Sequence, residues 1–274
     1  EQRWLIQIPR LFHIYKRMGI VESFEDMIQN IFAPLFEVTK DPQSNPDLHL
    51  FLTTVVGFDC VDDESNEPPD SFKASAPPPP ASWTGKTNPP YSYWMYYLYA
   101  NLATLNSLRA ARRMNTFEFR PHCGEAGDVD HLSSCFLTAS KINHGIQLRK
   151  EPGMQYLYYL MQIGIAMSPL SNNKLFLDYA RSPFRKFFAR GLHVSLSTDD
   201  PLMLHYTKDP LLEEYSVAAQ VWKLSSTDVC EIARNSVLQS GFEPRFKRHF
   251  MGDGYSASIP AGHPDAIGCA APAA

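Results

Sequence analysis

The feature that most constrains this chain is an alternation of short apolar runs with longer segments of helical pattern. Six runs are short and almost wholly apolar, as is typical of parallel strands that are buried on both faces. They cover Trp4–Ile8, Val55–Asp59, Phe117–Arg120, Ile142–Asn143, Ile163–Met167 and Val194–Leu196. This alternation predicts an α/β fold. Six strand–helix units are fewer than the eight of a closed (β/α)8 barrel.

Helical patterns fill the intervals between these runs. Among them, the spacing predicts helices over Tyr91–Arg113, Val129–Ala139, Leu211–Trp222 and Ser226–Gly241. In the third of these, Glu213 and Glu214 fall in the first turn, where acidic side chains favour the positive end of the helix dipole.

Composition narrows the class of protein. The 274 residues are 44% hydrophobic and 20% charged, which is ordinary for a globular chain. The net charge of −4 offers no general basic field for nucleic acid or anionic lipid, and no run approaches the roughly 18 apolar residues of a membrane span. The five cysteines are scattered and odd in number, which favours a reducing compartment over a disulfide framework. We therefore expect a cytoplasmic protein with no nucleic-acid partner and no membrane span.

Two segments differ from the rest in composition. Residues 68–90 are rich in proline, with four in a row at Pro77–Pro80, and cannot be helical there. From residue 252 onward the chain is rich in Ala, Gly and Pro and has almost no apolar periodicity. We therefore divide the chain into residues 1–251, which carry the α/β pattern, and a tail of residues 252–274.

Chemically capable side chains follow five of the predicted strands. In a parallel α/β fold the carboxyl ends of the strands meet at one face, where active sites are built. The residues concerned are Asp62, Asp63 and Glu64, then His122 and Glu125, then His144, then Ser168, Ser171, Asn172 and Asn173, and finally Asp199 and Asp200. This shared placement predicts a functional site.

The residue types indicate metal-assisted acid–base chemistry. His122 and Asp199 offer the nitrogen and oxygen ligands that zinc accepts. Glu125 could act as a general acid in a closed pocket, and His144 could orient or deprotonate a metal-activated water. Each residue also has a purely structural interpretation, since a single histidine at a strand end is commonly a packed side chain and Asp-Asp-Pro is commonly a turn or helix cap.

Some motifs are absent from the sequence. A catalytic zinc usually has three protein ligands, and this chain offers two clear ones. No two histidines are separated by one residue, and there is no His-x-Glu with Pro-Cys-x-x-Cys of the base-editing zinc deaminases. Neither a P-loop nor a Gly-x-Gly-x-x-Gly phosphate loop occurs.

Three short motifs follow predicted strands: HCGEAG (122–127), INHG (142–145) and SLSTDDP (195–201). They resemble motifs of the adenosine and AMP deaminase superfamily of metal-dependent barrels. Longer stretches resemble the AMP deaminases in particular: RWLIQIPR (3–10), GFDCVDDES (57–65), QIGIAMSPLSNN (162–173), STDDPLMLHYTKDPLLEEYSVAAQVWKLSS (197–226) and ARNSVLQSGF (233–242). The likeness covers roughly residues 2–251. It implies a TIM-type (β/α)8 barrel that is incomplete here, with about strands 3–8 present.

The resemblance assigns roles to individual residues. His122 and Asp199 match zinc ligands of the family, with one zinc ion per active site. Glu125 matches the acid that protonates the purine ring, and His144 the histidine that positions and deprotonates the attacking water. Substrate contacts are implied for Glu125 and for Asp200, Pro201, Leu202, Met203 and Asp62. The implied reaction is the hydrolysis of AMP to IMP and ammonia in purine nucleotide metabolism, with AMP and water as partners.

The sequence also departs from the family pattern. The family's first strand carries a His-x-His pair that supplies two zinc ligands, and no such pair occurs in this chain. We therefore expect the chain to be part of a longer protein, to be inactive or nearly so by itself, and to form a homo-oligomer in the complete enzyme. Tail 252–274 has no family counterpart. A deaminase of another adenine derivative and a non-catalytic truncated product remain alternatives.

Overall fold

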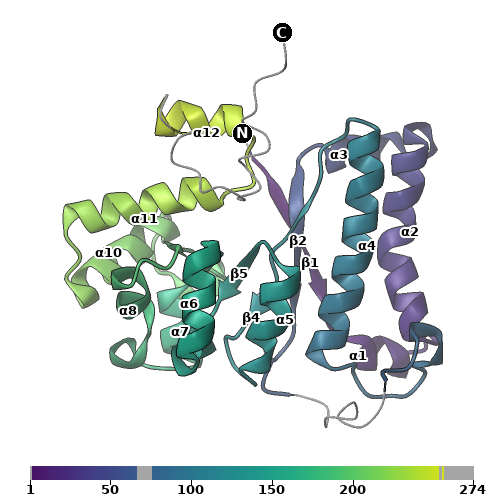
Figure 1. Ribbon diagram of the computed structural model, residues 1–274, viewed down its shortest axis with the longest axis horizontal. Coiled ribbons are helices and arrows are strands. Elements are labelled where there is room, and N and C mark those ends of the chain that lie inside the picture. Colours follow the sequence, from purple (N-terminus) through teal and green to yellow (C-terminus); the bar gives the residue numbers. More distant parts are fainter. Residues whose placement is uncertain (1, 67–75, 253–254, 256–274) are drawn as a thin grey trace. The chain divides into compact units, whose positions relative to one another are not determined.

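The computed structural model describes residues 2–66, 76–252 and Tyr255 of the chain (Figure 1). Nearly all of the predicted tail and part of the proline-rich segment, residues 67–75, lie outside the described residues. The chain divides into two compact units, residues 1–140 and 141–274. None of the described helices combines the length and the apolar character that a membrane crossing requires.

The first unit contains a parallel sheet in the order β1-β2-β3. Strand β1 (Trp4–Pro9) pairs with β2 (Val55–Val61), which in turn pairs with β3 (Glu118–Phe119). Gly57 is required where β2 meets β3, because a Cβ atom there would lie 2.5 Å from the Glu118 carbonyl oxygen. Strand β4 (His122–Cys123) follows directly. The three predicted strands of this unit are confirmed, but β4 is an addition, since those two residues were expected in a loop.

Helices cover this sheet. They are α1 (Phe12–Arg17), α2 (Phe24–Lys40), α3 (Pro46–Leu52), α4 (Tyr91–Ala111) and α5 (Asp130–Thr138), with short 3-10 turns η1 (Pro42–Ser44) and η2 (Pro80–Ser82). A capping box between Ser23 and Asp26 starts α2. Helices α2 and α4 lie side by side (Figure 1), and Phe24 packs edge-on against Trp94 at 4.6 Å between ring centroids. The predicted helices α4 and α5 are confirmed; α2 is not among the predicted ones.

The second unit contains the parallel strands β5 (Lys141–His144), β6 (Gly164–Met167) and β7 (Val194–Leu196) in that order. All three agree with the predicted runs. The helices are α6 (Pro152–Met161), α7 (Pro169–Leu175), α8 (Phe184–Ala189), α9 (Pro201–Leu204), α10 (Pro210–Trp222), α11 (Ser226–Gln239) and α12 (Pro244–Met251), with 3-10 turns η3 (Ile146–Lys150) and η4 (Tyr179–Arg181).

Two buried amides of α11 hold strand β7 in the second unit. The Asn235 side chain donates to the Val194 carbonyl oxygen at 3.1 Å, and the Gln239 side chain donates to the His193 carbonyl oxygen at 2.7 Å. The Ser195 hydroxyl donates to Gln239 at 2.7 Å. These bonds satisfy polar groups that would otherwise be costly to bury, and they fix the strand that leads into Asp199.

Candidate functional site

In the first unit a buried aspartate fixes the ring of His122. The carboxylate of Asp59, on β2, accepts hydrogen bonds from the backbone N–H of His122 at 3.0 Å and from its ring Nδ1 at 2.9 Å. Gln7, on β1, donates to the other carboxylate oxygen at 3.1 Å. Because Asp59 takes Nδ1, a metal held by this ring would use Nε2. A carboxylate on the second ring nitrogen is the usual arrangement for a histidine that ligates a metal.

Asp59 is a site residue that the sequence analysis missed. It was placed at the end of an apolar strand and given no role. The available signal was its charge, because an aspartate within a wholly apolar buried strand requires a polar partner. The identity of that partner, His122, could not be read from the sequence, since the two residues are 63 positions apart.

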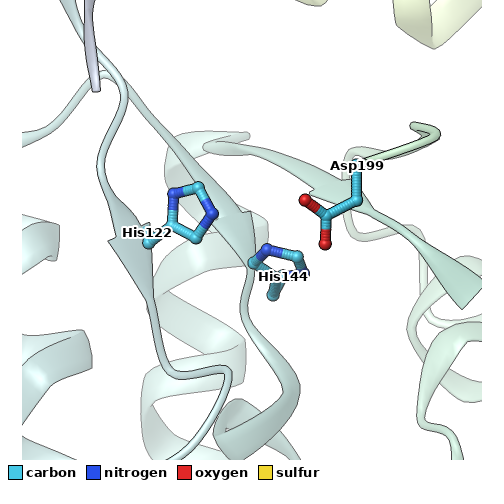
Figure 2. A group of neighbouring side chains, drawn as sticks. All are labelled: His122, His144 and Asp199. Atoms are coloured by element: carbon cyan, nitrogen blue, oxygen red, sulfur yellow. The ribbon is translucent and has the colours of Figure 1, made fainter. Parts of the chain in front are cut away.

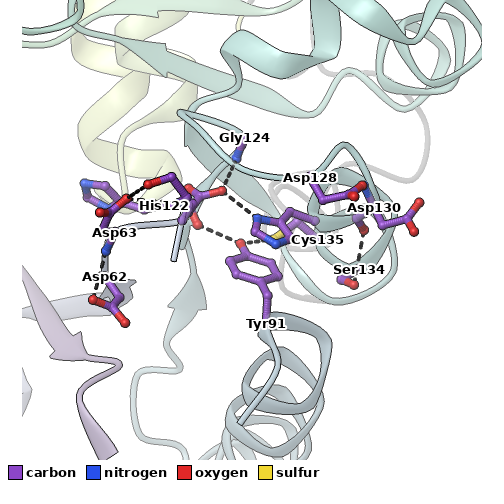
Figure 3. A network of polar contacts seen from close by, with 12 residues as sticks. Asp62, Asp63, Tyr91, His122, Gly124, Asp128, Asp130, Ser134 and Cys135 are labelled. Carbon is purple, nitrogen blue, oxygen red and sulfur yellow. Dashed lines mark hydrogen bonds and ion pairs between the residues drawn. The ribbon is translucent and has the colours of Figure 1, made fainter. Parts of the chain in front are cut away.

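A second buried carboxylate holds the loop that follows His122 (Figure 3). Glu64, only 4% exposed, accepts from the Gly124 backbone N–H at 2.8 Å and pairs with Nδ1 of His131 at 2.8 Å. The Tyr91 ring stacks on the His131 ring at 4.0 Å, and its hydroxyl donates to the His122 carbonyl oxygen at 2.6 Å. The backbone on both sides of His122 is therefore fixed.

The loop carrying Glu125 is closely packed. Gly124 and Gly127, on either side of it, have φ values of 69° and 68°, in the left-handed region that favours glycine. A Cβ atom at Gly127 would lie 2.0 Å from the Glu64 carbonyl oxygen, so no other residue fits there. Glu125 itself is half-buried. Its proposed role as an acid stays a prediction.

The carboxylate of Asp62 forms hydrogen bonds with nearby loop residues. One carboxylate oxygen accepts from the Asp63 backbone N–H at 2.8 Å, and the other accepts from the Asn88 side chain at 3.1 Å. The neighbouring Asp63 caps a turn through Ser65 and Asn66. These bonds account for both oxygens of Asp62 structurally, and its contact with substrate stays a prediction.

In the second unit, His144 and Asp199 lie close together (Figure 2). A ring nitrogen of His144 and a carboxylate oxygen of Asp199 are within 4.8 Å of each other. Both residues adopt positive backbone φ angles, 70° for His144 and 54° for Asp199, which residues other than glycine rarely adopt. Such backbone strain concentrates at functional sites.

One helical turn positions both of these side chains. The Ser171 hydroxyl, in α7, donates to a carboxylate oxygen of Asp199 at 2.6 Å. The next residue, Asn172, has its side-chain nitrogen 3.2 Å from Nδ1 of His144. Ser171 and Asn172 are both buried. The polar residues after β6 therefore act by holding His144 and Asp199 in place.

The loop after Asp199 carries several exposed side chains. Asp200 occupies the N-cap position of α9, as the helix-cap interpretation of Asp-Asp-Pro expects, but its side chain makes no capping hydrogen bond. Its exposed carboxylate has no hydrogen bond or ion pair with the described residues. Leu202 and Met203 are 100% and 68% exposed. The predicted substrate contacts of Asp200, Pro201, Leu202 and Met203 therefore stay predictions on an accessible segment.

Glu214 differs from the sequence prediction. The first turn of α10 contains Glu213 as expected, but Glu214 lies just beyond that turn and is fully buried. It accepts from the Leu170 backbone N–H at 3.3 Å and contacts Nε2 of His205 at 3.1 Å. Burial raises the pKa of Glu214 to about 8, and the nearby charges of Glu213 and Asp199 act in the same direction. The carboxyl group is therefore largely protonated at neutral pH.

Comparisons with known proteins agree with these motifs. A family model described as AMP deaminase matches residues 1–267. A probable AMP deaminase of Oryza sativa subsp. japonica is 61% identical over 252 residues, which is 92% of this chain and 31% of the relative. The AMP deaminase of Saccharomyces cerevisiae is 61% identical over 256 residues, 93% of this chain and 31% of the relative. The chain thus spans about a third of the length of these curated relatives.

Solved structures give the fold. An adenine deaminase from Arthrobacter aurescens matches with a TM-score of 0.59 at 17% identity, covering 91% of this chain and 59% of the other. An amidohydrolase from Burkholderia ambifaria with bound zinc matches with a TM-score of 0.59 at 16% identity, covering 93% of this chain and 56% of the other. The likeness confirms the expected fold class, a TIM-type α/β barrel that is incomplete in this chain.

Proposed function

The chain belongs to the AMP deaminase family, and from that premise we propose that it is part of an enzyme that hydrolyses AMP to IMP and ammonia. The observation that carries the proposal is the identity of about 61% to AMP deaminases from plants and yeast, which extends over more than nine-tenths of the chain. Identity at this level spans the strands, the loops and the helices that hold the candidate site residues.

The proposed cofactor is one zinc ion, held in part by His122 and Asp199. Imidazole nitrogen and carboxylate oxygen are donors that zinc accepts. Within its own unit each is oriented by a hydrogen-bonded partner, Asp59 for His122 and Ser171 for Asp199, as metal ligands commonly are. A protein of the same fold is described with bound zinc. When bound, zinc activates water for attack at neutral pH.

The remaining side chains would move protons and hold the substrate. His144 is proposed to accept a proton from the attacking water, whose oxygen bonds to the purine carbon that carries the amino group. Glu125 is proposed to protonate the adjacent ring nitrogen. The proton held by His144 is proposed to pass to the amino group, which leaves as ammonia when the carbon–nitrogen bond breaks, and the hydroxyl proton returns to Glu125 as the carbonyl forms. Proton transfers of this kind contribute about 10²- to 10⁴-fold each. Asp200, with Pro201–Met203 and Asp62, is proposed to contact AMP.

For the setting of the enzyme, we infer a cytoplasmic homo-oligomer in which residues 1–251 form one partial barrel. The cysteines of the described part of the chain support a reducing compartment: Cys60, Cys123 and Cys135 are buried and Cys230 is exposed, and all four are free thiols.

A chimera tests the proposed function. In it, residues 1–252 of this chain replace the matching region of the 61%-identical S. cerevisiae enzyme, and ammonia release is measured with AMP, adenosine and adenine. We expect turnover of AMP within about tenfold of the yeast enzyme, and none of adenosine or adenine. The 274-residue chain, assayed alongside with zinc present, is expected to release little ammonia. A folded chimera that turns over adenosine faster than AMP would overturn the proposal.

A further inference from the structure

The second unit contains a cavity of about 400 Å³ whose charged side chains are all positive. Residues of turns η3 and η4 and of helices α6 and α8 line it. Five of the ten residues that line it are cationic, and none is acidic: Arg149, Lys150, Arg181, Lys186 and Arg190. Such a cluster is unexpected in a chain whose net charge is −4.

Within the described part of the chain, these cations lack carboxylate partners. No acidic side chain there forms an ion pair with Arg149, Lys150, Arg181 or Lys186. Lys186 and Arg190 are four residues apart across the end of α8, a spacing at which like charges repel. Cations gathered around a concave surface without a counter-charge create a field that attracts anions.

The floor of the cavity is ordered. Gln155, in α6, is 5% exposed; its side chain donates to the Leu148 carbonyl oxygen at 2.8 Å and accepts from the Arg190 guanidinium. Phe187, 1% exposed, supplies an apolar wall. All five cations are exposed. Arg190 is held by its hydrogen bond to Gln155, while the other four can adjust to a ligand.

From this arrangement we propose that the cavity binds a phosphate-bearing anion. Three of the five cations are arginines, whose planar guanidinium groups match the oxygens of phosphate in pairs. A volume of about 400 Å³ accommodates a small molecule such as a polyphosphate or the phosphate groups of a nucleotide. None of the lining residues is among those proposed for the deamination site, so this inference does not rest on the proposed function.

Calorimetric titration of the full 274-residue chain tests the proposal, with tripolyphosphate as the probe. We expect binding that weakens as salt is added, because exposed charges are screened. The double variant Arg181→Gln/Lys186→Gln is expected to raise the Kd at least about tenfold, since two charge-assisted contacts are lost. The matched control Arg185→Gln/Lys223→Gln removes the same charge from exposed positions outside the cavity and is expected to change the Kd less than twofold.

A competition arm identifies the source of the phosphate. Displacement of tripolyphosphate by AMP would assign the cavity to a nucleotide monophosphate, and displacement by ATP but not by AMP would assign it to a polyphosphate. Circular-dichroism melts confirm that each variant is folded. Absence of tripolyphosphate binding by the folded chain, or an equal loss in the control variant, would overturn the proposal.

Discussion

The two compact units hold their candidate site residues by different physical means. In the first unit two buried carboxylates, Asp59 and Glu64, fix His122 and the loop that follows it. In the second, two neutral side chains, Ser171 and Asn172, fix Asp199 and His144. A buried charge that loses its partner costs far more than a neutral hydrogen bond does. The first unit is therefore predicted to be the more fragile of the two.

The largest effect is expected from Glu64→Ala. This change leaves the Gly124 N–H and the His131 ring, both buried, without their acceptor. We expect the free energy of unfolding to fall by about 3–5 kcal/mol, as for a broken buried pair, measured by urea denaturation. The control Glu22→Ala removes a carboxylate that is 83% exposed and paired with Lys16; a loss below about 1 kcal/mol is expected. Equal losses in the two variants would contradict the comparison.

Asp59→Asn is expected to have the next largest effect, on metal binding. It preserves the shape of the side chain but removes the charge that orients His122. Loss of such a partner typically lowers metal affinity about 10- to 100-fold. Zinc titration of the chimera measures this, with Asp63→Asn, an exposed aspartate nearby, as the control. Unchanged affinity in Asp59→Asn would show that the hydrogen bond is structural only.

Glu214 is a buried acid in the second unit, and its effect on the stability of the chain is expected to depend on pH. Its pKa is about 8 when folded, against an ordinary value of 4.5. At this group the folded state therefore binds more protons than the unfolded state between these values, so the contribution of Glu214 to stability is fully present below pH 4.5 and is lost as the pH rises towards 8. Glu214→Gln is expected to flatten this fall and to stabilise the chain by more than about 1 kcal/mol at pH 8. Parallel curves of unfolding free energy against pH for the unmodified chain and for Glu214→Gln would contradict this expectation.

The smallest effect is expected from Ser171→Ala. It removes the hydroxyl that donates to the half-buried Asp199 carboxylate, so stability should fall by about 1.5 kcal/mol, the lower end for a hydrogen bond to a charged group. In the chimera we expect kcat for AMP to fall about tenfold with the fold intact. Ser216→Ala, which removes an exposed hydroxyl of α10, serves as the control. A loss as large as that of Glu64→Ala would end the distinction between the units.

The sequence predicted the strands well because parallel buried strands consist of continuous apolar residues. Val194–Leu196 agrees residue for residue, and Val55–Asp59 differs only in its end. Strand β4 was not predicted because it has only two residues, one of which is polar. Its pairing depends on the tertiary fold and leaves no periodicity to read.

The candidate residues at strand ends were also accessible to sequence reasoning, but their partners were not. Asp59 pairs with His122 across 63 residues, and Glu64 with His131 across 67. The sequence placed Glu214 near the start of a helix but gave no sign of its burial, which comes from the packing of α10 against α7. Long-range packing decides such burial, and a single sequence does not contain it.

The central claim is that His122 ligates the metal while Glu125 acts as an acid. The most direct test measures zinc content and ammonia release from AMP in the chimera with His122→Ala and, separately, with Glu125→Gln. We predict that His122→Ala loses zinc and activity together, and that Glu125→Gln retains zinc while kcat falls about 10²- to 10⁴-fold. Full zinc content in a folded His122→Ala protein would contradict the claim.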